Sequence, residues 1–240
     1  MKQIISIVFL TFSVFLSNAQ VQYRQFKKEI KQEISINYAL QLPDNYDKIE
    51  KEWPLILFLH GSGERGDDLE KVAIHGPLKY VREGHKIDAI IIAPQCPDNQ
   101  YWGDVDFIVP LISDLEENYA IDTTRIYITG LSMGGYGTWF YSLKHSEIFA
   151  AIAPVCGPTF RTFPRNANVI KDKPIWIFHG AKDDVVDVSE SEAMYEALKN
   201  AGGNPKLTIY PEANHDSWTE TFNNPLFYEW LLSKTLKNEN

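Results

Sequence analysis

Basic residues are in deficit in this sequence of 240 residues. Lysine and arginine number 23 against 32 aspartates and glutamates, a formal net charge of −9 at pH 7. No basic run offsets the deficit, so we expect no nucleic-acid partner. Cysteine is rarer still, since only Cys96 and Cys156 are present. They lack metal-site spacing and each follows a different predicted strand, so we expect neither a disulfide between them, nor a metal, nor another cofactor.

Long apolar runs are also missing, apart from one at the start. Lys2 precedes an almost unbroken apolar run from Ile4 to Leu16, and Ser17-Asn18-Ala19 then supplies small residues. The run is short for a membrane anchor, the alternative interpretation, which needs about 20 residues. The pattern is typical of a secretory signal peptide over residues 1–19, cleaved near Ala19. We expect a secreted or periplasmic protein with no membrane anchor in its mature chain.

Short apolar segments alternate with helical ones through residues 20–240, which we interpret as a single domain. A continuously apolar run such as Pro54–Leu59 is typical of a strand covered on both faces. The expected strands cover residues 35–42, 54–59, 89–93, 125–129, 150–155, 174–178 and 206–210, and the expected helices cover 105–119, 136–144, 189–201 and 226–236. This alternation predicts an α/β fold, with a mostly parallel sheet between two layers of helices.

One glycine-rich segment, Gly130-Leu-Ser-Met-Gly134, fits the pattern G-x-S-x-G. An apolar strand precedes it and a helical segment follows, which is the setting of a nucleophile on a tight strand-to-helix turn. Side chains at Gly130 and Gly134 would collide in such a turn, and Gly135 would let the helix pack closely on the sheet. We therefore predict that Ser132 is a nucleophile.

A serine nucleophile needs a base, and the base needs an acid that orients it. The acid is expected after a later strand, where Phe178-His-Gly-Ala-Lys-Asp183 favours Asp183. Asp184, a turn residue, and Asp187, a helix cap, are the alternatives. The base is expected after the last strand, where His215 is the histidine in the right place.

An oxyanion hole should complete the site, and it needs two N–H donors. The residue after the nucleophile, Met133, should supply one of them. The other should come from the loop His60–Gly66, where we expect the N–H of Ser62, with Gly63 as the alternative. Two other histidines, His60 and His179, lie at the ends of predicted strands, and we expect them to make structural hydrogen bonds.

Together these segments resemble the α/β-hydrolase superfamily, and within it secreted esterases of the polyhydroxybutyrate-depolymerase and feruloyl-esterase kind. The resemblance covers residues 55–218 and implies a serine esterase that acts on a small-molecule or polysaccharide-borne ester. It also suggests that Trp102 and Trp218 present aromatic faces to a sugar or phenolic ring. The short interval between Val155 and Pro174 leaves no room for a lid domain.

The first hypothesis is therefore removal of feruloyl or acetyl groups from plant polysaccharides through an acyl-enzyme. Two alternatives stay open. One is a serine peptidase of the prolyl-oligopeptidase type, although such enzymes normally carry a large gating domain. The other is a non-catalytic binding protein on a hydrolase frame. The acyl group, the alcohol and the oligomeric state are not specified by the sequence.

Overall fold

The computed structural model describes residue 21, residues 23–28 and residues 33–236. The chain divides into one part up to Glu33 and another from Ile34 onward. In the first part the described residues are exposed and lie in neither helix nor strand. The predicted signal peptide, residues 1–19, lies outside the described residues. Among the described helices, none has the length and apolar character needed to cross a bilayer.

In the part from Ile34 onward, the described strands form one seven-stranded sheet of order β1-β3-β2-β4-β5-β6-β7. Only β1 runs antiparallel to its neighbour, β3, and every other pairing is parallel. The strands are β1 (Tyr38–Gln41), β2 (Trp53–Leu59), β3 (Ile90–Pro94), β4 (Ile121–Leu131), β5 (Ala151–Val155), β6 (Trp176–Gly180) and β7 (Lys206–Tyr210). Each predicted strand is present, and the mostly parallel sheet is confirmed.

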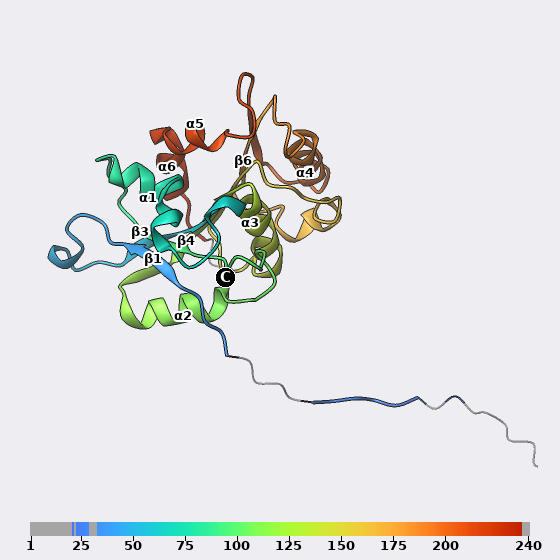
Figure 1. Cartoon of the computed structure of the whole chain (residues 1–240), viewed down its shortest axis with the longest axis horizontal. Coiled ribbons are helices and arrows are strands. Elements are labelled where there is room, and N and C mark those ends of the chain that lie inside the picture. The colour runs from blue at the N-terminus through green and yellow to red at the C-terminus, as the bar shows by residue number, and fades with distance from the viewer. Residues whose placement is uncertain (1–20, 22, 29–32, 237–240) are drawn as a thin grey trace, which may run out of the picture. The chain divides into compact units, whose positions relative to one another are not determined.

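Helices connect these strands (Figure 1). The α-helices are α1 (Gly76–Arg82), α2 (Ile108–Asn118), α3 (Met133–Lys144), α4 (Ser189–Asn200), α5 (Trp218–Phe222) and α6 (Pro225–Leu232). Short 3-10 helices are η1 (Tyr46–Lys48), η2 (Ser62–Glu64), η3 (Leu69–Ala73) and η4 (Pro164–Val169). The four predicted helices are present within a few residues of their expected bounds, whereas α1 and α5 were not predicted.

Two hydrophobic cores lie on opposite faces of the sheet. Successive residues of β2 point to opposite faces of the sheet. Leu55 and Leu57 belong to one core, and Ile56 and Phe58 belong to the other. The first core contains side chains of α2, α3 and α4, and the second contains side chains of α1, α5 and α6. All seven residues of β2 are buried. The continuous apolar runs of the sequence therefore reflect a sheet that is covered on both faces.

Parallel pairing brings the carboxyl ends of the strands to one edge of the sheet. Strands β2, β4, β5, β6 and β7 all run in the same direction. The loops that follow them carry Ser62, Ser132, Cys156, Asp183 and His215, in that order. Open parallel sheets bind ligands at this edge.

Candidate active site

Ser132 lies between β4 and α3 in a strained conformation, with φ 54° and ψ −116°. Its N–H donates to the carbonyl of Val155, at the end of β5. A Cβ on Gly134 would overlap the carbonyl oxygen of Leu59, and one on Gly130 would lie 2.5 Å from the carbonyl oxygen of Gly134. The predicted collisions are therefore confirmed. Strain of this kind persists only where the surrounding structure enforces it.

A continuous hydrogen-bonded chain joins the three residues predicted as nucleophile, base and acid. The Oγ atom of Ser132 lies 2.9 Å from Nε2 of His215. On the other side of the ring, Nδ1 of His215 lies 2.8 Å from Oδ2 and 3.0 Å from Oδ1 of Asp183. A carboxylate can only accept, so Nδ1 carries the proton and Nε2 accepts from the Ser132 hydroxyl.

Asp183 is held as a carboxylate. Its side chain is fully buried, and Oδ1 also accepts from the N–H groups of Val185 and Val186, both at 2.9 Å. Burial by itself raises the pKa of Asp183, but hydrogen bonds from His215, Val186 and Val185 outweigh it and hold the pKa below its ordinary value. The charge that could orient and stabilise an imidazolium is therefore present.

The two competing aspartates lie elsewhere. Asp184 is exposed. Oδ1 of Asp187 accepts from the N–H of Ser189 at 2.9 Å, at the start of α4. Asp187 lies one residue before the N-cap, Val188, but still bonds the first N–H of α4. Of the three aspartates, only Asp183 is bonded to His215.

Backbone contacts fix His215 relative to Asp183. The loops after β6 and β7 are joined by hydrogen bonds from Ala181 to Tyr210 and from Lys182 to Ala213, both at 2.9 Å. A side chain on Gly180 would overlap the carbonyl oxygen of Asn214, the residue before His215. The second loop therefore lies directly on the end of β6.

A second histidine, His179, is fully buried and also approaches Asp183. Nε2 of His179 lies 2.9 Å from the carbonyl oxygen of Val186 and 3.2 Å from Oδ2 of Asp183. Its Nδ1 lies 2.7 Å from the hydroxyl of Ser191. Because the carbonyl can only accept, Nε2 carries the proton and Ser191 donates to Nδ1. The predicted structural bonds of His179 are confirmed, and they extend to the carboxylate.

His60 likewise makes structural hydrogen bonds. Its Nδ1 lies 2.6 Å from the carbonyl oxygen of Gly61, and Nε2 accepts from the N–H of Cys96 at 3.0 Å. Burial lowers the pKa of His60 to about 4, so its imidazole is neutral near pH 7. This ring holds the end of β2 against the segment after β3.

The two predicted oxyanion donors lie in neighbouring segments. Met133 is the first residue of α3, and the first intrahelical bond is donated by Tyr136 to Ser132, so the Met133 N–H belongs to the free first turn. Ser62 begins η2 and is exposed. A Cβ on the preceding residue, Gly61, would lie 2.7 Å from the Leu131 side chain. The loop therefore packs against the residue that precedes Ser132.

Trp102 does not present a face to substrate, so that prediction is wrong. Only 2% of the residue is exposed. Its indole N–H donates to the carbonyl of His60 at 2.9 Å, and its side chain fills the space above Gly137 of α3. The ring is buried because its N–H has a partner at the end of β2 and because Gly137 leaves space for it.

Trp218 lies beside the site, at the first position of α5 and half-buried. Its ring meets the imidazole of His215 edge to face, with centroids 5.2 Å apart. The ring centroid of His75 also lies 5.5 Å from that of Trp218. Trp218 therefore packs against His215 while part of its surface remains accessible.

A strained aromatic loop was not anticipated. Phe160 and Arg161 have φ 48° and 56°, and Phe160 is 65% exposed. The carboxylate of Glu190 holds this loop by accepting from the N–H and hydroxyl of Thr159 and from the N–H of Phe160. The Phe160 ring lies 5.7 Å from that of Tyr136, one turn after Ser132 on α3. An aromatic surface thus borders the site on this side.

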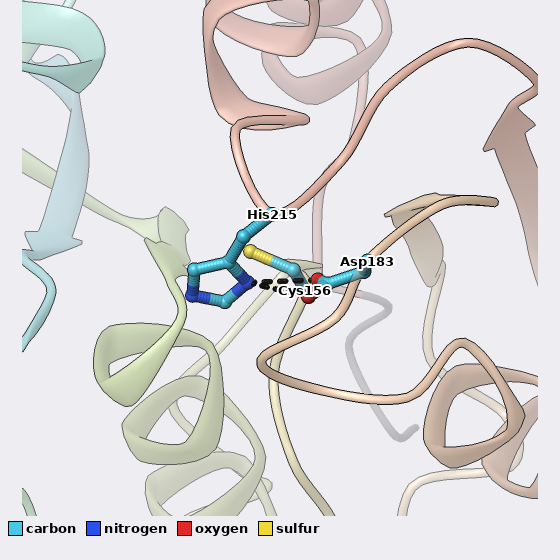
Figure 2. Close-up of side chains that lie close together, drawn as sticks. All are labelled: Cys156, Asp183 and His215. Carbon is cyan, nitrogen blue, oxygen red and sulfur yellow. Dashed lines mark hydrogen bonds and ion pairs between the residues drawn. The ribbon is translucent and has the colours of Figure 1, made fainter.

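Cys156 completes the surroundings of the site. Both Cys156 and Cys96 are free and buried. However, the donor atoms of Cys156, Asp183 and His215 all lie within 4.8 Å of one another (Figure 2). These three residues are far apart in the sequence, so the spacing along the chain did not reveal the cluster. The clue to this cluster in the sequence is that each of the three residues follows a predicted strand. These strands, β5, β6 and β7, are adjacent and parallel in the sheet.

Comparison with known proteins identifies the family. The family model for phospholipases and carboxylesterases matches residues 106–225, half of the chain, and this region includes Ser132, Asp183 and His215. The chain belongs to this phospholipase/carboxylesterase family. Its fold is the α/β-hydrolase fold that the sequence predicted, and the family is one of ester-cleaving hydrolases.

Individual relatives include a thermostable esterase of known structure. It superposes with a TM-score of 0.71 at 33% identity, over 85% of this chain and 60% of that one. Probable feruloyl esterase C from Aspergillus niger is 25% identical over 77% of this chain and 68% of its own length. A Salmonella typhimurium protein that bears the name carboxymethylenebutenolidase is 27% identical over 62% of this chain. The chain spans 60% of that protein's length.

Proposed function

We propose that the protein is a serine carboxylic ester hydrolase in which Ser132 is the nucleophile, His215 the general base and Asp183 the orienting acid. The observation that carries this proposal is the hydrogen-bonded chain from Asp183 through the His215 ring to Ser132 Oγ, with distances of 2.8 and 2.9 Å. Membership of an esterase family supports the same reaction class.

The reaction follows from the tautomer of His215. Ser132 Oγ attacks the ester carbonyl carbon while Nε2 of His215 takes the hydroxyl proton, and Asp183 stabilises the imidazolium. The N–H groups of Met133 and Ser62 receive the oxyanion of the tetrahedral intermediate. The imidazolium then gives its proton to the leaving alcohol, and an acyl-Ser132 ester remains. Water, activated by the same imidazole, releases the acid and restores the serine.

For the substrate, we propose feruloyl or acetyl groups carried by plant polysaccharides. Aromatic surface is available near Ser132, because the partly accessible Trp218 packs on His215 and the exposed Phe160 packs on Tyr136 of α3. Residues 156–175, between β5 and β6, contain only the short 3-10 helix η4 and no inserted lid domain, which favours access by a bulky polymer. The relative named as a feruloyl esterase supports this substrate class. Secretion through the N-terminal segment would bring the enzyme to such a polymer.

The test uses the full chain and a panel of aryl acetates, methyl ferulate, acetylated xylan and a long-chain lipid ester. We expect higher kcat/KM on methyl ferulate or acetylated xylan than on the lipid ester, and no increase in rate at a lipid interface. Ser132→Ala should lower kcat by a factor of order 10⁶. A fluorophosphonate reagent should label the parent protein once, with the mass increase on the peptide that contains Ser132.

Other outcomes distinguish the alternatives. Cleavage of acylated peptides in preference to esters would favour a peptidase of the prolyl-oligopeptidase type. Binding of sugars without turnover of any ester would favour a non-catalytic protein. Retention of activity within about tenfold in Ser132→Ala would overturn the assignment of the nucleophile.

A further inference from the structure

Cys156 lies beside the hydrogen-bonded pair of His215 and Asp183. It follows the last residue of β5 with φ 41°, and its N–H donates to the carbonyl of Phe178 at 2.8 Å. This left-handed residue ends the strand where the loops after β6 and β7 converge. In Figure 2 the sulfur lies next to the imidazole ring and the carboxylate of Asp183. The mechanism proposed above assigns it no role.

A second buried donor lies at the same place. The hydroxyl of Ser217 is fully buried and close enough to the thiol to lower its pKa, yet among the described residues it has no hydrogen-bond partner of normal geometry. Thiol, imidazole and carboxylate are the donor types that Zn²⁺ and its heavier relatives bind in tetrahedral sites. The unpartnered hydroxyl, or a water, could provide an oxygen as the fourth ligand.

We infer that Cys156, Asp183 and His215 form an inhibitory binding site for a thiophilic divalent cation such as Zn²⁺ or Cd²⁺. Binding forms a bond from the metal to the Cys156 sulfur and releases the thiol proton to water. A second bond forms to Nδ1 of His215, the nitrogen that faces Asp183. The single proton of the neutral ring then resides on Nε2, so no other proton leaves the site.

This change of tautomer accounts for inhibition. Nε2 must have a free lone pair to accept the proton of Ser132, from which it lies 2.9 Å. A metal on Nδ1 places a proton on Nε2, and the imidazole can no longer act as a base. The effect on activity depends on the proposed function, whereas binding of the metal does not.

The site should discriminate between cations. The three donors are a thiol sulfur, an imidazole nitrogen and a carboxylate oxygen, a set that favours cations with high affinity for sulfur and nitrogen. Mg²⁺ and Ca²⁺ prefer oxygen ligands and should not bind. The chain also offers a matched control, because Cys96 is a second buried free thiol with a raised pKa, about 11, away from His215.

The experiment titrates Cd²⁺ into the metal-free full-length protein while recording the ultraviolet absorption of the cadmium–thiolate bond and the rate of aryl acetate hydrolysis. We expect one equivalent of Cd²⁺ to produce the band and to abolish activity, with full recovery on adding a chelator. Mg²⁺ should do neither. Cys156→Ser should remove the band and raise the half-inhibiting concentration at least about tenfold. Cys96→Ser should behave as the parent protein.

Inhibition at unchanged Cd²⁺ concentration in Cys156→Ser, or inhibition without the thiolate band, would overturn the inference. If Cys156→Ser does not fold, Cys156→Ala provides the same comparison. If no form of the protein cleaves esters, the proposed function fails, but the absorption titration of the parent protein and its Cys156 variant still tests the metal site.

Discussion

Nε2 of His179 lies 3.2 Å from the same oxygen of Asp183 to which Nδ1 of His215 is bonded at 2.8 Å. One carboxylate oxygen therefore lies between two imidazoles, and only the ring of His215 reaches Ser132. His179 is in turn held by Ser191 of α4. We interpret His179 as a positioning residue that fixes the direction of the Asp183 carboxylate.

Replacement of His179 tests this interpretation. His179→Leu should lower kcat on an aryl ester about tenfold, equivalent to ~1.4 kcal/mol, with little change in KM, because Asp183 loses an N–H neighbour that orients it. His179→Gln, which keeps an N–H donor, should recover part of the rate. Steady-state kinetics and thermal unfolding should be measured together. A lower melting temperature with unchanged kcat would show that His179 only stabilises the fold.

Asp183 and Asp184 provide a matched pair for the assignment of the acid. Asp183→Ala should lower kcat by a factor of about 10⁴, since no other carboxylate is bonded to His215. Asp184→Ala should remain near the parent rate because its side chain is exposed. Single-turnover acylation by an aryl acetate measures the difference. The reverse order of the two variants would move the acid by one residue.

The two tryptophans once expected to share a role should respond differently. Trp218→Ala should lower kcat/KM on methyl ferulate about tenfold to a hundredfold, which corresponds to roughly 1.4–2.7 kcal/mol, with a smaller effect on a short aryl acetate. Trp102→Ala should instead reduce the free energy of unfolding by about 3–5 kcal/mol, because it empties a core position and leaves the His60 carbonyl without its donor. Denaturant unfolding and kinetics on both esters separate the two effects.

His60 should make the stability of the fold depend on pH. Its pKa is about 4 in the folded chain against 6.5 for an ordinary histidine. Between these values the unfolded chain binds a proton that the folded chain does not, so stability falls as the pH drops from 6.5 toward 4. The loss amounts to roughly 3 kcal/mol over that interval.

Urea unfolding at pH 7 and pH 4.5 measures this contribution. In His60→Gln, whose amide can donate to Gly61 and accept from Cys96, the dependence on pH should be shallower. The exposed His85 offers a control, and His85→Gln should keep the dependence of the parent protein. An equal slope in both variants would rule out His60 as its source.

The sequence predicted the central strands because burial on both faces leaves a run such as Pro54–Leu59 without a polar residue. The predicted strand at residues 125–129 begins later than β4, which begins at Ile121. The reason is that Thr123 and Thr124 are polar and less deeply buried than the residues that follow. The sequence missed α5, which has only five residues and too few turns to show a helical period. Local pattern thus reveals long or fully buried elements and misses short ones.

The site was predictable to the extent that chain order and strand ends determine it. Ser132, Asp183 and His215 each follow a predicted strand, and parallel pairing then brings them together. The direction in which a side chain points could not be predicted in the same way. Trp102 turns inward toward a carbonyl 42 positions earlier in the chain, and nothing near it in the sequence reveals that partner. The approach of His179 to Asp183 also depends on three-dimensional packing.

The close backbone contact between Gly134 and Leu59 has a consequence for how such enzymes diversify. At the nucleophile turn, main chain meets main chain, and Gly135 similarly meets Gly157 after β5. No side chain can be added at these glycines without moving Ser132. The loop with Phe160 and Arg161 lies on the rim, where Glu190 holds the backbone and both side chains are exposed. Random mutagenesis should therefore change substrate preference through substitutions at Phe160 and Arg161. The turn around Ser132 should tolerate almost no substitution.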